Sequence, residues 1–126
     1  MPLDILRITD PGCPYAWSAE PAMTVLRSRY RDQITWSLSM IGLAEDGGSY
    51  EAKGFGPVPM AQGYQRFSRQ YGMPVTNAVR RRSLATWPAC RIVVAAGFDA
   101  PDRQAAVHRA LQVRKVLPVQ PVLLAL

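Results

Sequence analysis

The start of the chain alternates between strand and helix patterns, which restricts it to a small set of α/β folds. Leu3 to Thr9 is apolar and β-branched, as in a buried strand. Asp10-Pro11-Gly12 is a turn sequence, and from Pro14 onward apolar residues recur with helical spacing over about four turns. Gln33 to Ile41 then alternates apolar and polar residues. This order predicts a right-handed βαβ unit with parallel strands.

Cys13 stands at the junction between the first strand and the helix. A sulfur there lies near unpaired backbone N–H groups and the positive end of the helix dipole, which favours thiolate over thiol. Pro14 suits an early helical position, and Tyr15 follows it. Ala16 occupies the place where a CxxC motif would have its second cysteine. Cys13 is therefore the candidate nucleophile, and Pro21 is expected to kink the helix behind it.

The rest of the chain is predicted to be mainly helical. We expect an irregular loop rich in glycine and proline, followed by three helices. Asp99 or Asp102 is expected to cap the last helix. A tail interrupted by prolines follows, in which residues 121–126 could form a strand. The predicted loop covers residues 42–59, and the helices cover Met60 to Tyr71, Ser83 to Gly97, and a segment ending near Leu117.

Composition narrows the classes of function. With 126 residues, 48% hydrophobic and 19% charged, the chain suits one globular domain, and no apolar run is long enough to cross a bilayer. No signal peptide is recognisable, so a cytoplasmic location and no membrane partner are expected. The net charge of +6 permits contact with nucleic acid without requiring it, and no nucleic-acid partner is expected. Arg80-Arg81-Arg82 is interpreted as a solvated loop, because no nucleic-acid-binding module accompanies it.

The remaining reactive residues are few. Cys13 and Cys90 are the two cysteines, which is too few for a disulfide scaffold, and they show no metal-ligand spacing. Cys90 fits a small apolar residue on the buried face of a helix, with a distant resolving thiol for Cys13 as the alternative. His108 is the only histidine, and we interpret it as an ordinary surface or core residue of its helix rather than a catalytic base.

Several segments together resemble the DsbA-like branch of the thioredoxin superfamily. The resemblance spans roughly residues 3 to 115. It is carried by Thr9-Asp10-Pro11-Gly12-Cys13-Pro14-Tyr15-Ala16-Trp17 with Glu20-Pro21, by Met40-Ile41-Gly42-Leu43, by the segment from Arg66 to Pro74, and by the segment from Arg82 to Ala96.

This resemblance implies a thioredoxin-like α/β fold with a helical insertion, incomplete at the C-terminus. It divides the chain into a βαβ part (1–42), a loop and helical insertion (43–117) and a tail (118–126). The family normally continues with further strands and a cis-proline opposite the cysteine. Neither Pro118 nor Pro121 matches that proline by pattern. A sheet without those strands has an exposed edge, through which two copies could form a homodimer.

The resemblance also implies an activity on thiols and disulfides. Cys13 would exchange with glutathione or a protein thiol and be released by a second thiol from solution, while Tyr15 and Trp17 would form an apolar lip for the partner. No cofactor is expected apart from glutathione as a co-substrate. Two alternatives stay open: a glutathione-binding transferase or isomerase related to the kappa class, whose Ser-Pro-Tyr motif resembles Cys13-Pro14-Tyr15, and a non-catalytic binding module.

Overall fold

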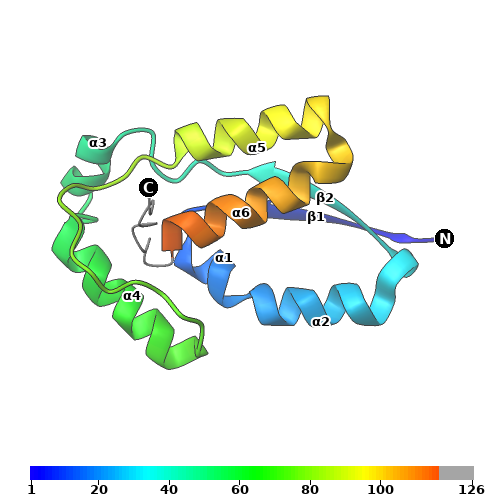
Figure 1. Ribbon diagram of the computed structural model, residues 1–126, viewed down its shortest axis with the longest axis horizontal. Helices are drawn as coiled ribbons and strands as arrows, with labels where there is room; N and C mark the ends of the chain where they lie inside the picture. The colour runs from blue at the N-terminus through cyan, green and yellow to red at the C-terminus, as the bar shows by residue number, and fades with distance from the viewer. Residues whose placement is uncertain (117–126) are drawn as a thin grey trace, which may run out of the picture.

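Two parallel strands begin the fold in the computed structural model, which describes residues 1–116. Strand β1 (Leu3–Thr9) pairs with β2 (Ile34–Met40) over its full length, from Leu3 opposite Ile34 to Thr9 opposite Met40. Helices α1 (Pro14–Ser18) and α2 (Glu20–Tyr30) and the 3-10 turn η1 (Arg31–Gln33) connect them (Figure 1). The predicted α/β class, strand positions and parallel pairing are confirmed.

The helix after Cys13 is divided more completely than predicted. In place of one kinked helix, α1 ends at Ser18 and α2 begins at Glu20, with Ala19 between them. Pro21 lies in the first turn of α2. A proline within a continuous helix would lack its N–H donor and its ring would clash with the carbonyl four residues earlier, here Trp17. The break places Pro21 where neither cost arises.

The helical insertion contains more helix than the sequence pattern predicted. Its elements are α3 (Gly47–Ala52), α4 (Pro57–Tyr71), α5 (Trp87–Asp99), the 3-10 turn η2 (Pro101–Arg103) and α6 (Gln104–Val116). The predicted loop thus holds a short helix, α3, whose first turn is capped by the Asp46 side chain accepting the N–H of Ser49 at 2.7 Å. The glycine at the end of α4 was correctly predicted: Gly72 has a left-handed φ of 73°.

The remaining differences from the predicted helices lie at the helix ends. Pro57 and Pro88 each lie in the first turn of a helix, so α4 begins three residues earlier than predicted and α5 begins at Trp87 rather than Ser83. The prediction that Asp99 or Asp102 caps the last helix is wrong. Asp99 ends α5 and Ala100 caps η2.

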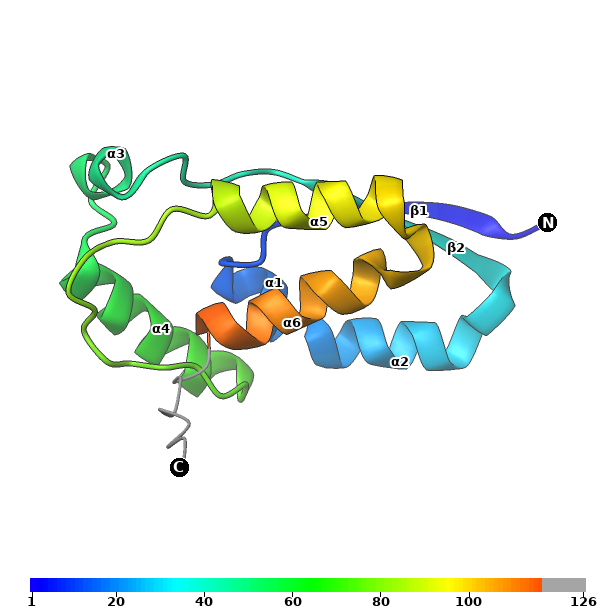
Figure 2. The same cartoon turned by 45° about the horizontal axis from the view of Figure 1, so that its top comes forward.

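The core lies between the helices and one face of the sheet. In both views α6 lies between α5 and α2 (Figures 1 and 2), and Val93 on α5 and Gln112 on α6 are fully buried. The opposite sheet face exposes Leu6 and Ile8 at 59% and 64%.

Within the described residues each strand has one edge with no partner strand, the kind of edge predicted to pair with a second copy. The predicted tail strand, with Pro118 and Pro121, lies outside the described residues.

None of the helices in residues 1–116 combines the length and the apolar character that crossing a membrane requires.

Candidate active site around Cys13

Backbone hydrogen bonds fix the position of Cys13 at the end of β1. Its N–H donates to the carbonyl oxygen of Asp10 at 3.1 Å, and its own carbonyl oxygen accepts the N–H of Trp17 at 3.1 Å. Cys13 is the extended N-cap residue of α1 and Pro14 is in the first turn. The cysteine is free and partly exposed. The predicted strand–turn–cysteine–helix arrangement is therefore present.

Asp10 is the residue that connects this turn to the rest of the protein. Its side chain is fully buried, and Oδ1 accepts the N–H of Gly12 at 2.7 Å. Oδ2 accepts the N–H of Leu43 at 2.9 Å, the hydroxyl of Thr86 at 2.7 Å and the thiol of Cys90 at 3.4 Å. One carboxylate thus joins the Cys13 turn to the segments after β2 and before α5.

Gly12 is required at this turn by a close approach of the chain. A Cβ atom at position 12 would lie 2.8 Å from Cγ2 of Thr86. Thr86 is itself held, because its hydroxyl donates to Asp10 and accepts the N–H of Ala44 at 3.0 Å. The sequence identified Asp10 and Gly12 only as turn residues. Their partner Thr86, more than seventy positions away, left no local signal.

Cys90 occupies a different environment from Cys13. It lies on α5, only 6% exposed, and both cysteines are free. Burial, followed by the charge of Asp10, raises the pKa of the Cys90 thiol to about 11. A thiol that stays protonated at neutral pH is a poor nucleophile. This environment fits the packing role for Cys90, and the resolving role stays a prediction.

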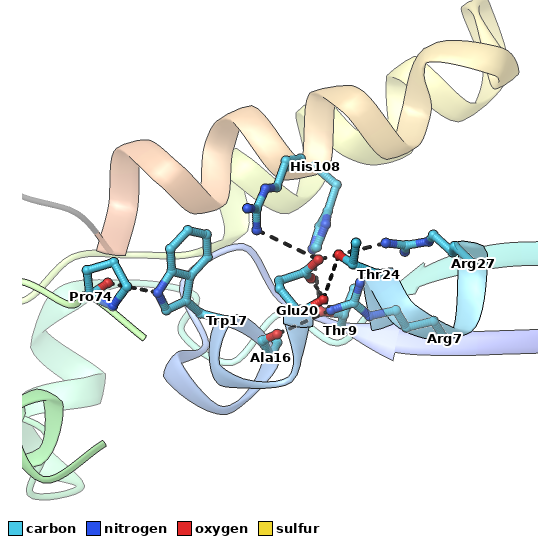
Figure 3. Close-up of polar contacts among 10 residues, drawn as sticks. Arg7, Thr9, Ala16, Trp17, Glu20, Thr24, Arg27, Pro74 and His108 are labelled. Carbon is cyan, nitrogen blue, oxygen red and sulfur yellow. Dashed lines mark hydrogen bonds and ion pairs between the residues drawn. The ribbon is translucent and has the colours of Figure 1, made fainter. Parts of the chain in front are cut away.

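The residues that follow Cys13 are divided between surface and core. Tyr15 is 62% exposed and its ring meets Phe67 of α4 edge-on, with centroids 4.3 Å apart. Trp17 is only 3% exposed, and its Nε1–H donates to the carbonyl of Pro74 at 2.9 Å (Figure 3). The expectation that Trp17 lines a substrate lip is therefore wrong, because its ring packs in the core. Ala16 is partly buried, and its carbonyl accepts a hydrogen bond from Arg7 at 3.3 Å.

A narrow cavity of about 50 Å³ lies next to the Cys13 turn. Its lining combines the turn, aromatic residues of the insertion and two cations, among them Gly12, Tyr50, Phe55, Tyr64, Arg80 and Arg82. Burial raises the pKa of both Tyr50 and Tyr64; at Tyr64 the charge of Arg80 acts in the opposite direction but is outweighed. The two phenols are therefore protonated at neutral pH. The three arginines lie in a loop, as predicted, and Arg81 and Arg82 are exposed. The sequence did not indicate that Arg80 and Arg82 also line this cavity.

His108 takes no part in this cavity. It is 2% exposed on α6, and its Nε2 lies 3.4 Å from the hydroxyl of Thr9. Burial lowers its pKa to about 4, so the ring is neutral at physiological pH. It is a core residue, one of the two ordinary roles that the sequence left open for it. In the part of the chain that the structure describes, no three His, Cys, Asp or Glu side chains gather as a metal site.

Comparison with known proteins supports the fold through structure rather than sequence. No protein-family model matches the chain, and no curated protein matches it. A Nitrosomonas europaea protein provisionally named a protein disulfide isomerase superposes with a TM-score of 0.71 at 21% identity, over 92% of this chain and 56% of that one. The cytosolic disulfide reductase DsbM from Pseudomonas aeruginosa superposes with a TM-score of 0.66 at 17% identity, over 91% of this chain and 55% of its own.

DsbM has also been solved with glutathione, and that structure superposes with a TM-score of 0.63 at 17% identity, over 91% of this chain and 56% of its own. The chain therefore spans a little over half the length of these structures. With Cys13 in a strand–turn–helix junction and a helical insertion after β2, the chain has the thioredoxin-like fold of the DsbA-like proteins.

Proposed function

We propose that Cys13 carries out monothiol exchange between glutathione and disulfides. The observation that carries this proposal is the placement of one free, partly exposed cysteine in a hydrogen-bonded turn beside a cavity lined by tyrosines and arginines. Support comes from the fold neighbours, one named a disulfide reductase and solved with glutathione. The cytosolic location given for DsbM supports a cytoplasmic setting, where glutathione is available.

The exchange runs in two balanced steps. The Cys13 thiolate attacks the glutathione sulfur of a protein–glutathione mixed disulfide, so that a Cys13–glutathione bond forms and the protein leaves as a thiolate. A second glutathione thiolate then attacks this new disulfide, which releases oxidised glutathione and restores the Cys13 thiolate. Because Ala16 supplies no second thiol within the motif, the reducing thiol comes from solution.

The cavity supplies groups that suit glutathione. The protonated phenols of Tyr50 and Tyr64 can donate hydrogen bonds, and Arg80 and Arg82 provide positive charge for the carboxylates of the tripeptide. A volume of about 50 Å³ takes one end of the tripeptide, with the cysteinyl sulfur left outside toward Cys13. The exposed ring of Tyr15 lies at the surface where a protein substrate would approach.

The test is reduction of a glutathionylated peptide, followed as the formation of oxidised glutathione in the presence of excess glutathione. Cys13→Ser should abolish the catalysed rate, whereas Cys90→Ser, the matched control, should retain it. Equal catalysis by the Cys13→Ser variant would overturn the proposal.

A glutathione-binding transferase or isomerase is the second candidate, because Arg80 and Arg82 favour an anionic ligand whether or not Cys13 reacts. It predicts that glutathione raises the melting temperature of the Cys13→Ser variant while the parent shows no exchange. Exchange by the parent that is lost in Cys13→Ser would instead favour the monothiol enzyme.

A further inference from the structure

A second cavity, of about 150 Å³, lies on the helix-covered face of the sheet. It shares no lining residue with the cavity beside Cys13. Figure 3 shows Arg7, Glu20, Arg27 and His108 converging from β1, α2 and α6. The polar and charged residues of its wall are mainly Arg7, Glu20, Arg27, His108, Arg109 and Gln112.

The charges in this cavity are not balanced. Glu20 is 5% exposed, and its Oε1 binds Nη2 of Arg7 at 2.5 Å. The other carboxylate oxygen, Oε2, lies 3.8 Å from Nη1 of Arg27 and 3.7 Å from Nη1 of Arg109. These separations are longer than hydrogen bonds, so the two outer guanidinium groups are paired loosely with the carboxylate. Each also lies over a tryptophan ring, Trp36 for Arg27 and Trp17 for Arg109, and their side chains are 37% and 48% exposed. Three arginines face one glutamate, and the buried imidazole of His108 is neutral, which leaves two positive charges in excess.

Gln112 gives an independent reason to expect that this cavity takes a ligand. Its side chain lines the cavity and is fully buried, and neither Nε2 nor Oε1 has a hydrogen-bond partner in the described part of the protein. Buried amides are almost always hydrogen-bonded, because a group that gives up water without a new partner destabilises the fold. To satisfy both atoms, a ligand must offer an acceptor to Nε2 and a donor to Oε1.

We propose that this cavity binds a small oxyanion that retains a hydroxyl hydrogen, with hydrogen phosphate as the simplest example. Its charged oxygens accept hydrogen bonds from Arg27, Arg109 and the Nε2 group of Gln112, and its hydroxyl donates to Oε1 of Gln112. The cavity has room for about five water molecules at roughly 30 Å³ each, so a tetrahedral oxyanion fits. Water alone would satisfy the amide, whereas an anion also compensates the positive charge of the partly exposed Arg27 and Arg109.

The probe is inorganic phosphate, measured by thermal unfolding and calorimetric titration at constant ionic strength. Sulfate is the control, because both anions stabilise proteins generally by exclusion from the surface, whereas sulfate has no hydroxyl hydrogen near neutral pH. We expect a saturable rise in melting temperature with phosphate that exceeds the rise with sulfate. Using the Cys13→Ser variant throughout separates this result from the thiol-exchange proposal.

Three variants test the assignment to this cavity. Arg109→Gln should weaken phosphate binding about tenfold, the effect of one charge-assisted hydrogen bond. Arg114→Gln removes the same charge from an exposed position on the same helix and should leave binding unchanged. Gln112→Leu should fold at least as stably as the parent without phosphate, because it removes the unpaired amide, and should lose the phosphate-dependent rise. Equal responses to phosphate and sulfate that persist in Arg109→Gln and Gln112→Leu would overturn the proposal.

Discussion

The thiol of Cys90 donates a hydrogen bond to Oδ2 of Asp10 across 3.4 Å of buried core. The same carboxylate orders the turn that holds Cys13, so the two cysteines share a neighbour but differ in environment. Cys13 is partly exposed, whereas Cys90 is buried and burial raises its pKa to about 11. The fold therefore separates the one accessible thiol from the one protected thiol.

Alkylation of the native protein should distinguish the two thiols. Because only the thiolate reacts and Cys90 is both buried and protonated near neutral pH, we expect iodoacetamide to label Cys13 at least about tenfold faster than Cys90. Peptide mass spectrometry of a time course measures both rates in one sample. In denaturant the two rates should become similar. Equal rates in the native protein would show that Cys90 is open to solvent.

Removing the charge of Asp10 should loosen the turn that carries Cys13. In Asp10→Asn one acceptor oxygen becomes an NH₂ donor that faces existing donors, so at least one charge-assisted hydrogen bond is lost in the core. We expect a loss of about 2–4 kcal/mol in the free energy of unfolding, measured in urea. Asp4→Asn, at an exposed position on β1, is the control and should change stability by less than about 0.5 kcal/mol.

The sequence predicted the N-terminal βαβ unit well because its signals are local. Strand alternation, the Asp10-Pro11-Gly12 turn and the placement of Cys13 each depend on residues close together in the chain. The fold-level prediction extended further only through the family resemblance.

The signals that failed were long-range. Trp17 was assigned to a surface lip, but its indole N–H is satisfied by Pro74, more than fifty positions away, and the ring is buried. Arg80 and Arg82 follow no helical or strand period, and only the fold brings them beside Gly12. The charged cluster around Glu20 likewise unites three elements, so no spacing within one element could reveal it.

Glu20 should be essential to the stability of that cluster. It pairs with Arg7, whose side chain is only 10% exposed, and it faces Arg27 and Arg109. Glu20→Gln leaves a buried cation without its partner, and we expect it to lower the free energy of unfolding by about 3 kcal/mol. Glu45→Gln, at an exposed position, is the matched control. A loss no larger than that of the control would mean that solvent already screens the pair.

Stability should decrease in mild acid because His108 is buried in its neutral form. Its pKa falls from 6.5 in the unfolded chain to about 4 in the fold, mainly through burial. Between these values the unfolded state binds the extra proton, so the free energy of unfolding falls as the pH drops from about 6.5 to about 4. The full effect is roughly 3 kcal/mol. Urea titrations at several pH values measure it, and His108→Gln should show a flatter profile over the same range.

Restoring a second cysteine should convert the motif to dithiol chemistry. Position 16 lies three residues after Cys13 on the first turn of α1, where side chains share one side of the helix. Ala16→Cys should therefore form a disulfide with Cys13 under mild oxidant, as CxxC motifs do, leaving one of three thiols titratable. In a single turnover the reduced variant should also reduce a substrate disulfide without added glutathione, because the second thiol displaces the product and the motif itself becomes the disulfide. Ala22→Cys, an exposed position on α2, should keep all three thiols. Three free thiols in oxidised Ala16→Cys would show that the turn around Cys13 cannot adopt disulfide geometry, and that its single-thiol chemistry is set by backbone as well as by sequence.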